Sequence, residues 1–224
     1  MLTGRYLLAA ASVGGRLYAI GGLDMESDAT GTVEAFDPQT GTWTAVAPML
    51  TRRREMGAAV VGGKIYVVGG YSESNARLAT VEVYDPATNT WAVASPMATA
   101  RSAFGMAALG GKIYAAGGNG TGGSLLSAVE AYDPQSNTWS AVAPMSTGRR
   151  YFGLAAMRGK LYAVGGMGGI ATVEAYDPQQ DRWESVPPSG THARAYHAAA
   201  ALCAGMCDTC PTEALGACAC FPLS

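Results

Sequence analysis

Short apolar runs alternate with polar turns along most of the chain, and each run has the length of a β-strand. Residues 57–61 form one such run, and a Gly-containing turn leads into a second run at residues 64–68, so the two are expected to pair as a hairpin. A third run at residues 81–84 alternates in the way that a half-buried strand does. A fourth run starts at Trp91. The pattern predicts a four-stranded antiparallel sheet.

The same unit occurs four times. Double glycines end the second predicted strand of every unit at a spacing of 48 residues, at Gly21-Gly22, Gly69-Gly70, Gly117-Gly118 and Gly165-Gly166. The four Trp residues follow at Trp43, Trp91, Trp139 and Trp183. The last of these intervals is 44 residues, so the fourth unit lacks four residues between its double glycine and its Trp. A fixed period of this length is typical of a repeat architecture.

Burial of the sheets determines the expected fold. A sheet of this size cannot bury both faces alone, whereas copies that pack face to face around an axis can, with aromatic rings between neighbours. The sequence therefore predicts an all-β propeller over residues 1–188, in which four four-stranded antiparallel blades span about 5–50, 51–98, 99–146 and 147–188 and form an incomplete or open ring. Residues 189–224 begin a fifth unit, but its pattern stops after Leu202 and a Cys-rich, disordered tail is expected.

Residues that recur in every unit are attributed to the scaffold. An Arg opens each unit and a Glu lies in each third strand, and we expect the two to pair. The Arg residues are Arg5, Arg53, Arg101 and Arg149, and the Glu residues are Glu34, Glu82, Glu130 and Glu174. An Asp-Pro turn follows each third strand and brings in a residue that tolerates a left-handed backbone, namely Gly41, Asn89, Asn137 or Asp181.

These units resemble kelch repeats. The resemblance lies in the double glycine after four apolar positions and in an aromatic residue seven positions before each Trp, at Phe36, Tyr84, Tyr132 and Tyr176. It covers residues 5–188 and implies a propeller that binds another protein, as the substrate-recognition adaptor of a ubiquitin ligase or as a cytoskeletal scaffold. Kelch propellers usually have more than four blades. The chain has no room for a BTB or F-box domain before Arg5, so an adaptor role rests on the resemblance alone.

Candidate binding residues are those that vary at equivalent positions. In a propeller, the loops from the fourth strand to the next first strand and from the second strand to the third share one face near the axis, and such loops carry function. Tyr71 and Tyr151 are singled out because the repeat does not account for them, whereas Tyr6 is assigned to the first strand. The partner-binding candidates are Arg52, Arg54, Glu55, Tyr71, Ser102, Asn119, Arg150, Tyr151 and Met167. Arginines at such a face predict a partner peptide of acidic character.

Charge and hydropathy exclude other partners. Charged residues make up 14% of the chain and the net charge is -2, which gives no overall field for nucleic acid or an anionic membrane. No apolar run approaches the roughly 20 residues of a membrane-spanning helix. The apolar segment at residues 5–12 is in register with the repeat, which favours a strand over a signal peptide and a cytoplasmic protein over a secreted one. Open blade edges would promote self-association.

Enzymatic chemistry is not expected, and neither is a cofactor. Both His residues lie beyond the four units, and most carboxylates belong to the scaffold, so no general base is evident. A copper oxidase of the galactose oxidase type needs His and Cys residues within its propeller, and residues 1–188 have none. Two alternatives to a binding module stay open: a carbohydrate-modifying, epimerase-like propeller enzyme, and a truncated fragment of a longer kelch protein.

All five Cys residues lie in the tail. Cys203, Cys207, Cys210 and Cys218 are zinc candidates, with His192 and His197 nearby, although the pair Cys218 and Cys220 is spaced poorly for a metal knuckle. Disulfides are an alternative that leaves one thiol over. The interpretation that fits the interrupted repeat best is a truncated or frame-shifted end without a metal.

Overall fold

The computed structural model describes residues 1–187, which fold into four sheets of four antiparallel strands each. The first blade comprises β1 (Ala9–Val13), β2 (Arg16–Ile20), β3 (Val33–Asp37) and β4 (Thr42–Val46). The second comprises β6 (Gly57–Val61), β7 (Lys64–Val68), β9 (Val81–Asp85) and β10 (Thr90–Ala94). The third comprises β11 (Gly105–Leu109), β12 (Lys112–Ala116), β13 (Val129–Asp133) and β14 (Thr138–Val142). The fourth comprises β15 (Gly153–Met157), β16 (Lys160–Val164), β17 (Val173–Asp177) and β18 (Arg182–Val186).

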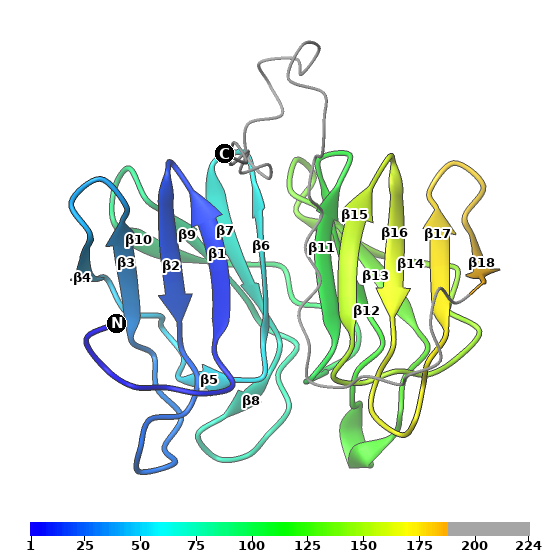
Figure 1. Cartoon of the computed structure of the whole chain (residues 1–224), viewed down its shortest axis with the longest axis horizontal. Coiled ribbons are helices and arrows are strands. Elements are labelled where there is room, and N and C mark those ends of the chain that lie inside the picture. Colours follow the sequence, from blue (N-terminus) through cyan, green and yellow to red (C-terminus); the bar gives the residue numbers. More distant parts are fainter. Residues whose placement is uncertain (188–224) are drawn as a thin grey trace, which may run out of the picture.

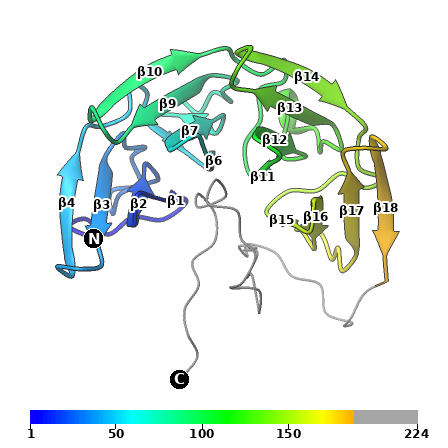
Figure 2. The same ribbon diagram turned by 90° about the horizontal axis from the view of Figure 1, so that it is seen from above.

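The four blades stand side by side around a common axis (Figure 1). Seen along that axis, the first strand of each blade lies innermost and the fourth lies outermost, and the blades form an arc that is open between the first and the fourth (Figure 2). The propeller fold predicted from the sequence is confirmed, with an open ring. The segment at residues 5–12 contributes to β1, but Tyr6 lies outside that strand and pairs with Leu23, so its assignment to the first strand was wrong. The fifth-blade strand and the Cys-rich tail fall outside the described residues.

The hydrophobic core lies between the blades. Tyr18 and Ile20 of the first blade pack against Ile65 and Tyr84 of the second, all nearly inaccessible to solvent. Tyrosines meet across each interface, with ring centroids 5.7 Å apart for Tyr18–Tyr84, 5.8 Å for Tyr66–Tyr132 and 5.8 Å for Tyr114–Tyr176. Each blade therefore depends on its neighbour to bury its face.

The double glycines allow this close approach. Gly69 has φ of 63°, and a Cβ there would lie 2.6 Å from the carbonyl oxygen of Arg101 in the next blade. Both the backbone conformation and the contact thus require glycine. The hydrogen bond that Gly70 N donates to the same carbonyl oxygen, at 2.8 Å, depends on that contact.

Polar ties between blades recur three times. Each Trp Nε1 from the second blade onward donates to a carbonyl oxygen of the preceding blade: Trp91 to Ala47 at 2.8 Å, Trp139 to Ser95 at 2.8 Å and Trp183 to Ala143 at 2.9 Å. The residues predicted to have a left-handed backbone form a second set of interblade hydrogen bonds. For example, Asn137 Oδ1 accepts from Tyr132 Oη at 2.7 Å and from Ser95 N at 2.9 Å. In the first blade, Phe36 and Gly41 occupy these positions and supply neither the hydroxyl nor the acceptor.

Each scaffold Arg is buried and clamps its own blade, as predicted. Arg101 Nη2 donates to Glu130 Oε1 at 2.6 Å, and its Nη1 donates to the carbonyl oxygens of Gly117 and Ala128, both at 2.9 Å. Burial lowers the pKa of Arg101, and the charge of Glu130 opposes that shift. The equivalent N···O distances are 3.7 Å for Arg5–Glu34, 2.5 Å for Arg53–Glu82 and 2.8 Å for Arg149–Glu174.

Candidate partner-binding face

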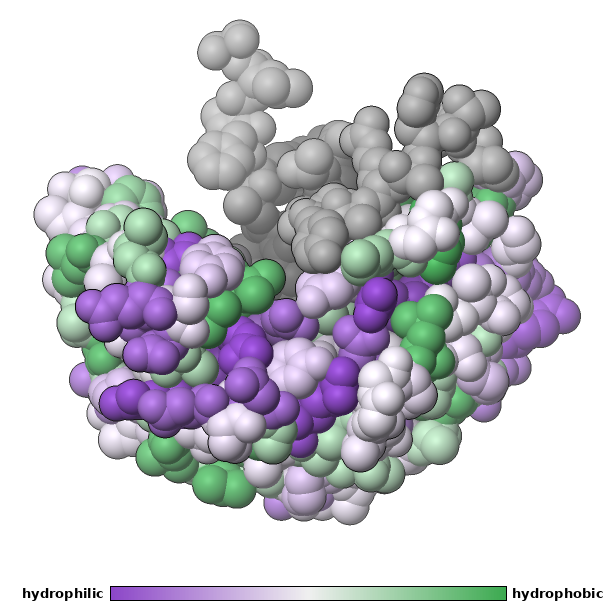
Figure 3. Space-filling model, turned by 90° about the horizontal axis from the view of Figure 1, so that it is seen from below, coloured by the Kyte–Doolittle hydropathy of each residue, from purple (hydrophilic) through white to green (hydrophobic). Residues whose placement is uncertain are grey.

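One end of the propeller carries the variable loops. These are the loops from each fourth strand to the next first strand and from each second strand to the third, and we call this end the loop face. It lies at the bottom of Figure 1, where β5 (Arg53–Arg54) and β8 (Tyr71–Ser72) form a small ladder of their own. Seen from below, hydrophilic residues cover much of the middle of this face (Figure 3).

The structure brings most candidate residues together in pairs. The position after the scaffold Arg lies beside the position after the double glycine, and this occurs in every blade. The pairs are Tyr6 with Leu23, Arg54 with Tyr71, Ser102 with Asn119, and Arg150 with Met167. In the last pair, Met167 N donates to Arg150 O at 2.9 Å. Six residues chosen separately from the sequence thus form three equivalent pairs on neighbouring blades.

Two guanidinium groups lie over the ring of Tyr71. Arg54 Cζ is 5.0 Å from the centroid of the Tyr71 ring, and Arg77 Cζ is 4.9 Å from it, which are cation–π distances. Arg54 also donates to Asn75 Oδ1 at 2.5 Å. The ring therefore holds two positive charges close together in a defined arrangement, a cluster that we call the Tyr71 stack.

The pair Ser102 and Asn119 is buried. The two backbones exchange hydrogen bonds at 3.1 and 2.8 Å, and both residues are nearly inaccessible to solvent. Asn119 Oδ1 accepts from Arg150 Nη1 at 3.2 Å, so a residue of the third blade orients an Arg of the fourth. In this structure Asn119 acts as a support for Arg150, and Ser102 is buried beneath the loop face.

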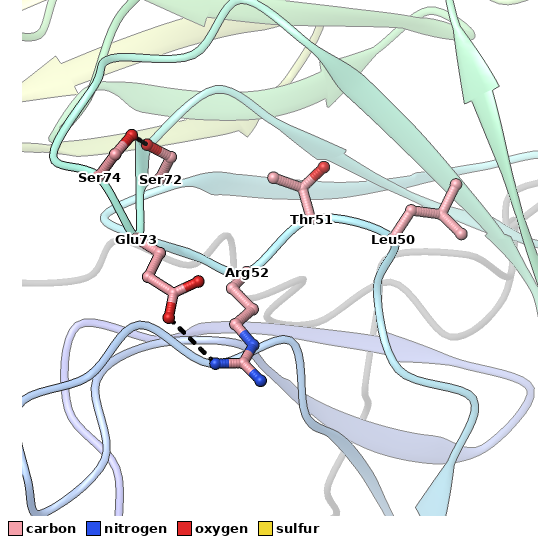
Figure 4. A pocket seen from close by; sticks show the side chains of 6 residues that line it. All are labelled: Leu50, Thr51, Arg52, Ser72, Glu73 and Ser74. Atoms are coloured by element: carbon pink, nitrogen blue, oxygen red, sulfur yellow. Dashed lines mark hydrogen bonds and ion pairs between the residues drawn. The ribbon is translucent and has the colours of Figure 1, made fainter.

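Arg52 lines a shallow open groove of about 630 Å³ together with Leu50, Thr51, Ser72, Glu73 and Ser74 (Figure 4). Its guanidinium is 3.2 Å from Glu73 Oε1, and Ser72 and Ser74 share a hydrogen bond of 2.9 Å. Both members of the ion pair are exposed, so water screens the pair and its net contribution is small. Arg52 is accessible but already has an acidic partner.

A second cavity, of about 300 Å³, lies where the innermost loops of the four blades meet. Two consecutive residues from each blade line it: Leu7 and Leu8, Glu55 and Met56, Ala103 and Phe104, and Tyr151 and Phe152. We call it the axial cavity. The first member of each pair has a left-handed backbone, with φ between 50° and 55°. Backbone hydrogen bonds of 2.9 to 3.0 Å join these residues in order, from Glu55 N to Leu7 O, Ala103 N to Glu55 O, and Tyr151 N to Ala103 O.

Three arginines of the loop face, unlike those of the scaffold, have no carboxylate partner within residues 1–187. Every scaffold Arg forms an ion pair with Glu, whereas Arg54, Arg77 and Arg150 form none with a carboxylate of residues 1–187. Sequence reasoning did not single out Arg77. The repeat could have revealed it, because Arg77 stands where the neighbouring units have Ala29 and Leu125.

No group of three or more His, Cys, Asp or Glu residues able to hold a metal ion occurs in residues 1–187. The zinc candidates Cys203, Cys207, Cys210 and Cys218 lie outside the described residues. No helix among residues 1–187 is long and apolar enough to cross a membrane.

Comparison with known proteins gave one result for the fold. A family model described as the KLHDC2/KLHL20/DRC7 Kelch-repeats domain matches residues 7–207. No curated protein matches the chain.

Proposed function

Because the chain belongs to the kelch-repeat family, we propose that its loop face binds a segment of a partner protein. A kelch-repeat domain is typically a protein-interaction module, and its rigid blades present variable loops on one face. The candidate contacts are the Tyr71 stack, Arg150 with its support Asn119, the ring of Tyr151, and Met167. Arg52 and Glu55 border these contacts in the groove and the axial cavity.

The charge of the loop face supports an acidic segment as the ligand. Arg54, Arg77 and Arg150 carry positive charges that no carboxylate of residues 1–187 pairs. An Asp or Glu side chain of a partner would supply the carboxylate that these guanidinium groups lack within residues 1–187. This unmatched cationic character is the observation that carries the proposal. A role as a substrate-recognition adaptor or cytoplasmic scaffold would use the same face.

A selection from a random peptide display library tests this function. The full chain should enrich peptides rich in Asp and Glu. The triple variant Arg54→Ala/Arg150→Ala/Tyr151→Ala should bind a selected peptide at least about tenfold more weakly, because each lost charged hydrogen bond contributes about 1.5–3 kcal/mol. Isothermal titration calorimetry measures the affinities.

The control is the double variant Arg16→Ala/Lys112→Ala, which removes two cations from the opposite end of the propeller, where they pair with Asp37 and Asp133. It should retain full affinity. Both variants should melt at nearly the wild-type temperature. Enrichment of peptides without acidic character, or unchanged affinity of the triple variant, would contradict the proposal.

A further inference from the structure

Glu55, which lines the axial cavity, has one carboxylate oxygen that is buried without a partner. Oε2 of Glu55 is inaccessible to solvent and accepts no hydrogen bond from residues 1–187. The Arg residues next in sequence to the cavity lining are engaged elsewhere, Arg54 at Tyr71 and Asn75, and Arg150 at Asn119. A carboxylate beside apolar walls that has no ion pair with residues 1–187 is costly, which favours a cation that enters the cavity from solvent.

The remaining walls of the cavity are mostly apolar. Leu7, Leu8, Met56, Phe104 and Phe152 line it together with Glu55, and the two Phe residues are largely buried. The cavity can therefore receive an alkyl chain along its walls and a single positive charge at Glu55. Its volume of about 300 Å³ exceeds that of one long side chain.

We propose that the axial cavity binds the side chain of a lysine in the partner segment, with its ammonium group on the carboxylate of Glu55. This inference rests on the proposed function and adds a basic residue to the acidic segment. Lysine fits better than arginine, because an ammonium is a compact point charge on an alkyl stem, whereas guanidinium usually binds both oxygens of a carboxylate.

Small probe molecules test the cavity without a known partner. The probes are 4-phenylbutylammonium, 4-phenylbutylguanidinium, the neutral 4-phenylbutanol and the anionic 4-phenylbutyrate, titrated into the full chain labelled at its Met methyl groups. The resonance of Met56, which lines the cavity and is assigned with Met56→Leu, reports binding. The ammonium should bind about tenfold more tightly than the alcohol.

Glu55→Gln keeps the shape of the side chain and removes its charge, so it should abolish the preference for the ammonium. Glu26→Gln removes the same charge from an exposed position in the loop between β2 and β3 and should leave the preference intact. Preference for the guanidinium would identify arginine as the occupant and overturn the assignment to lysine. No shift of Met56, tighter binding of the alcohol or butyrate, or an unchanged preference in Glu55→Gln would overturn the site itself. Because these measurements do not use Arg54, Arg150 or an acidic peptide, failure here is distinguishable from failure of the proposed function.

Discussion

The same residue type serves two purposes in this chain, and its surroundings separate them. Arg101 is fully buried and its charge is matched by Glu130, whereas Arg54 lies on the loop face over an aromatic ring. Removal of one member of a buried ion pair leaves the other charge without compensation in a medium of low polarity. The scaffold arginines should therefore control stability, and the arginines of the loop face should control binding.

At the residue scale, we expect Arg101→Ala to lower the free energy of unfolding by about 3–5 kcal/mol, because Glu130 stays buried without its partner. Arg16→Ala removes the same charge from an ion pair whose Arg side chain is 51% exposed, and should cost less than about 1 kcal/mol. Urea denaturation followed by tryptophan fluorescence gives both values. Equal losses in the two variants would show that the buried clamp has no special role.

Protonation should weaken the same clamps. Burial alone would raise the pKa of Glu174, but hydrogen bonds from Arg149 and Ser146 outweigh it and lower the pKa. A lowered pKa in the folded state adds stability that is complete above the ordinary carboxyl pKa and is lost as the pH falls through the folded value. Stability should thus fall below about pH 4, and Glu174→Gln should reduce this dependence. A urea midpoint in Glu174→Gln with the wild-type pH dependence would argue against this contribution.

At the scale of the blade, each of the three interfaces is joined by one hydrogen bond from a Trp side chain. The Trp of the first blade, Trp43, has no preceding blade among residues 1–187. No hydrogen bond from Trp43 Nε1 to another blade is formed within residues 1–187, although its ring packs on Phe36 as the other Trp rings pack on Tyr. Trp139 Nε1, in contrast, donates to Ser95 O at 2.8 Å. Substitutions of Trp43 and Trp139 can therefore be compared to test the contribution of the interblade hydrogen bond.

Trp139→Phe should therefore destabilise the protein by at least about 1 kcal/mol more than Trp43→Phe, since only the first change removes an interblade hydrogen bond and alters a ring that packs on a core cluster between blades. Thermal and urea denaturation followed by circular dichroism, which does not depend on the altered Trp, measure the difference. Equal destabilisation would show that the interblade hydrogen bond of Trp139 contributes nothing measurable.

Most of this architecture could be predicted at the sequence level. The strands, the left-handed Asn137 and the Arg–Glu pairs all follow from the 48-residue period, because a recurring residue type marks a recurring structural demand. Arg77 was missed, and so was the burial of Ser102, because each depends on how one loop folds against its neighbour. The axial cavity was also unpredictable, since it arises only where loops from four blades converge.

At the scale of the molecule, the arc has two unmatched faces. Leu17 of the first blade is 42% exposed, whereas its equivalents Ile65, Ile113 and Leu161 are fully buried by a preceding blade. On the fourth blade, Tyr162 is half-buried, whereas the equivalent Tyr114 is buried against Tyr176. Apolar surface of this kind favours association.

We therefore expect the full chain to self-associate in a concentration-dependent manner, and Leu17→Asp/Tyr162→Asp to reduce the association. Val93→Asp alters an apolar residue that is 72% exposed on the outermost strand of the second blade, away from the open faces, and should not have this effect. Light scattering coupled to size-exclusion chromatography gives the masses. A monomer at all concentrations would show that the exposed faces of the first and fourth blades do not drive association.

Within residues 1–187, the hydrogen bonds between blades run from each blade to the next. The Trp and Asn hydrogen bonds of the third blade reach the second, and those of the second reach the first. A copied segment of 48 residues would contain the donors for the preceding blade and the acceptors for the following one. If it were inserted between two blades, it would therefore replace every interblade hydrogen bond that its insertion breaks. Genetic duplication or loss of whole units is therefore compatible with continued folding, and the number of blades is a quantity that evolution can change in single steps.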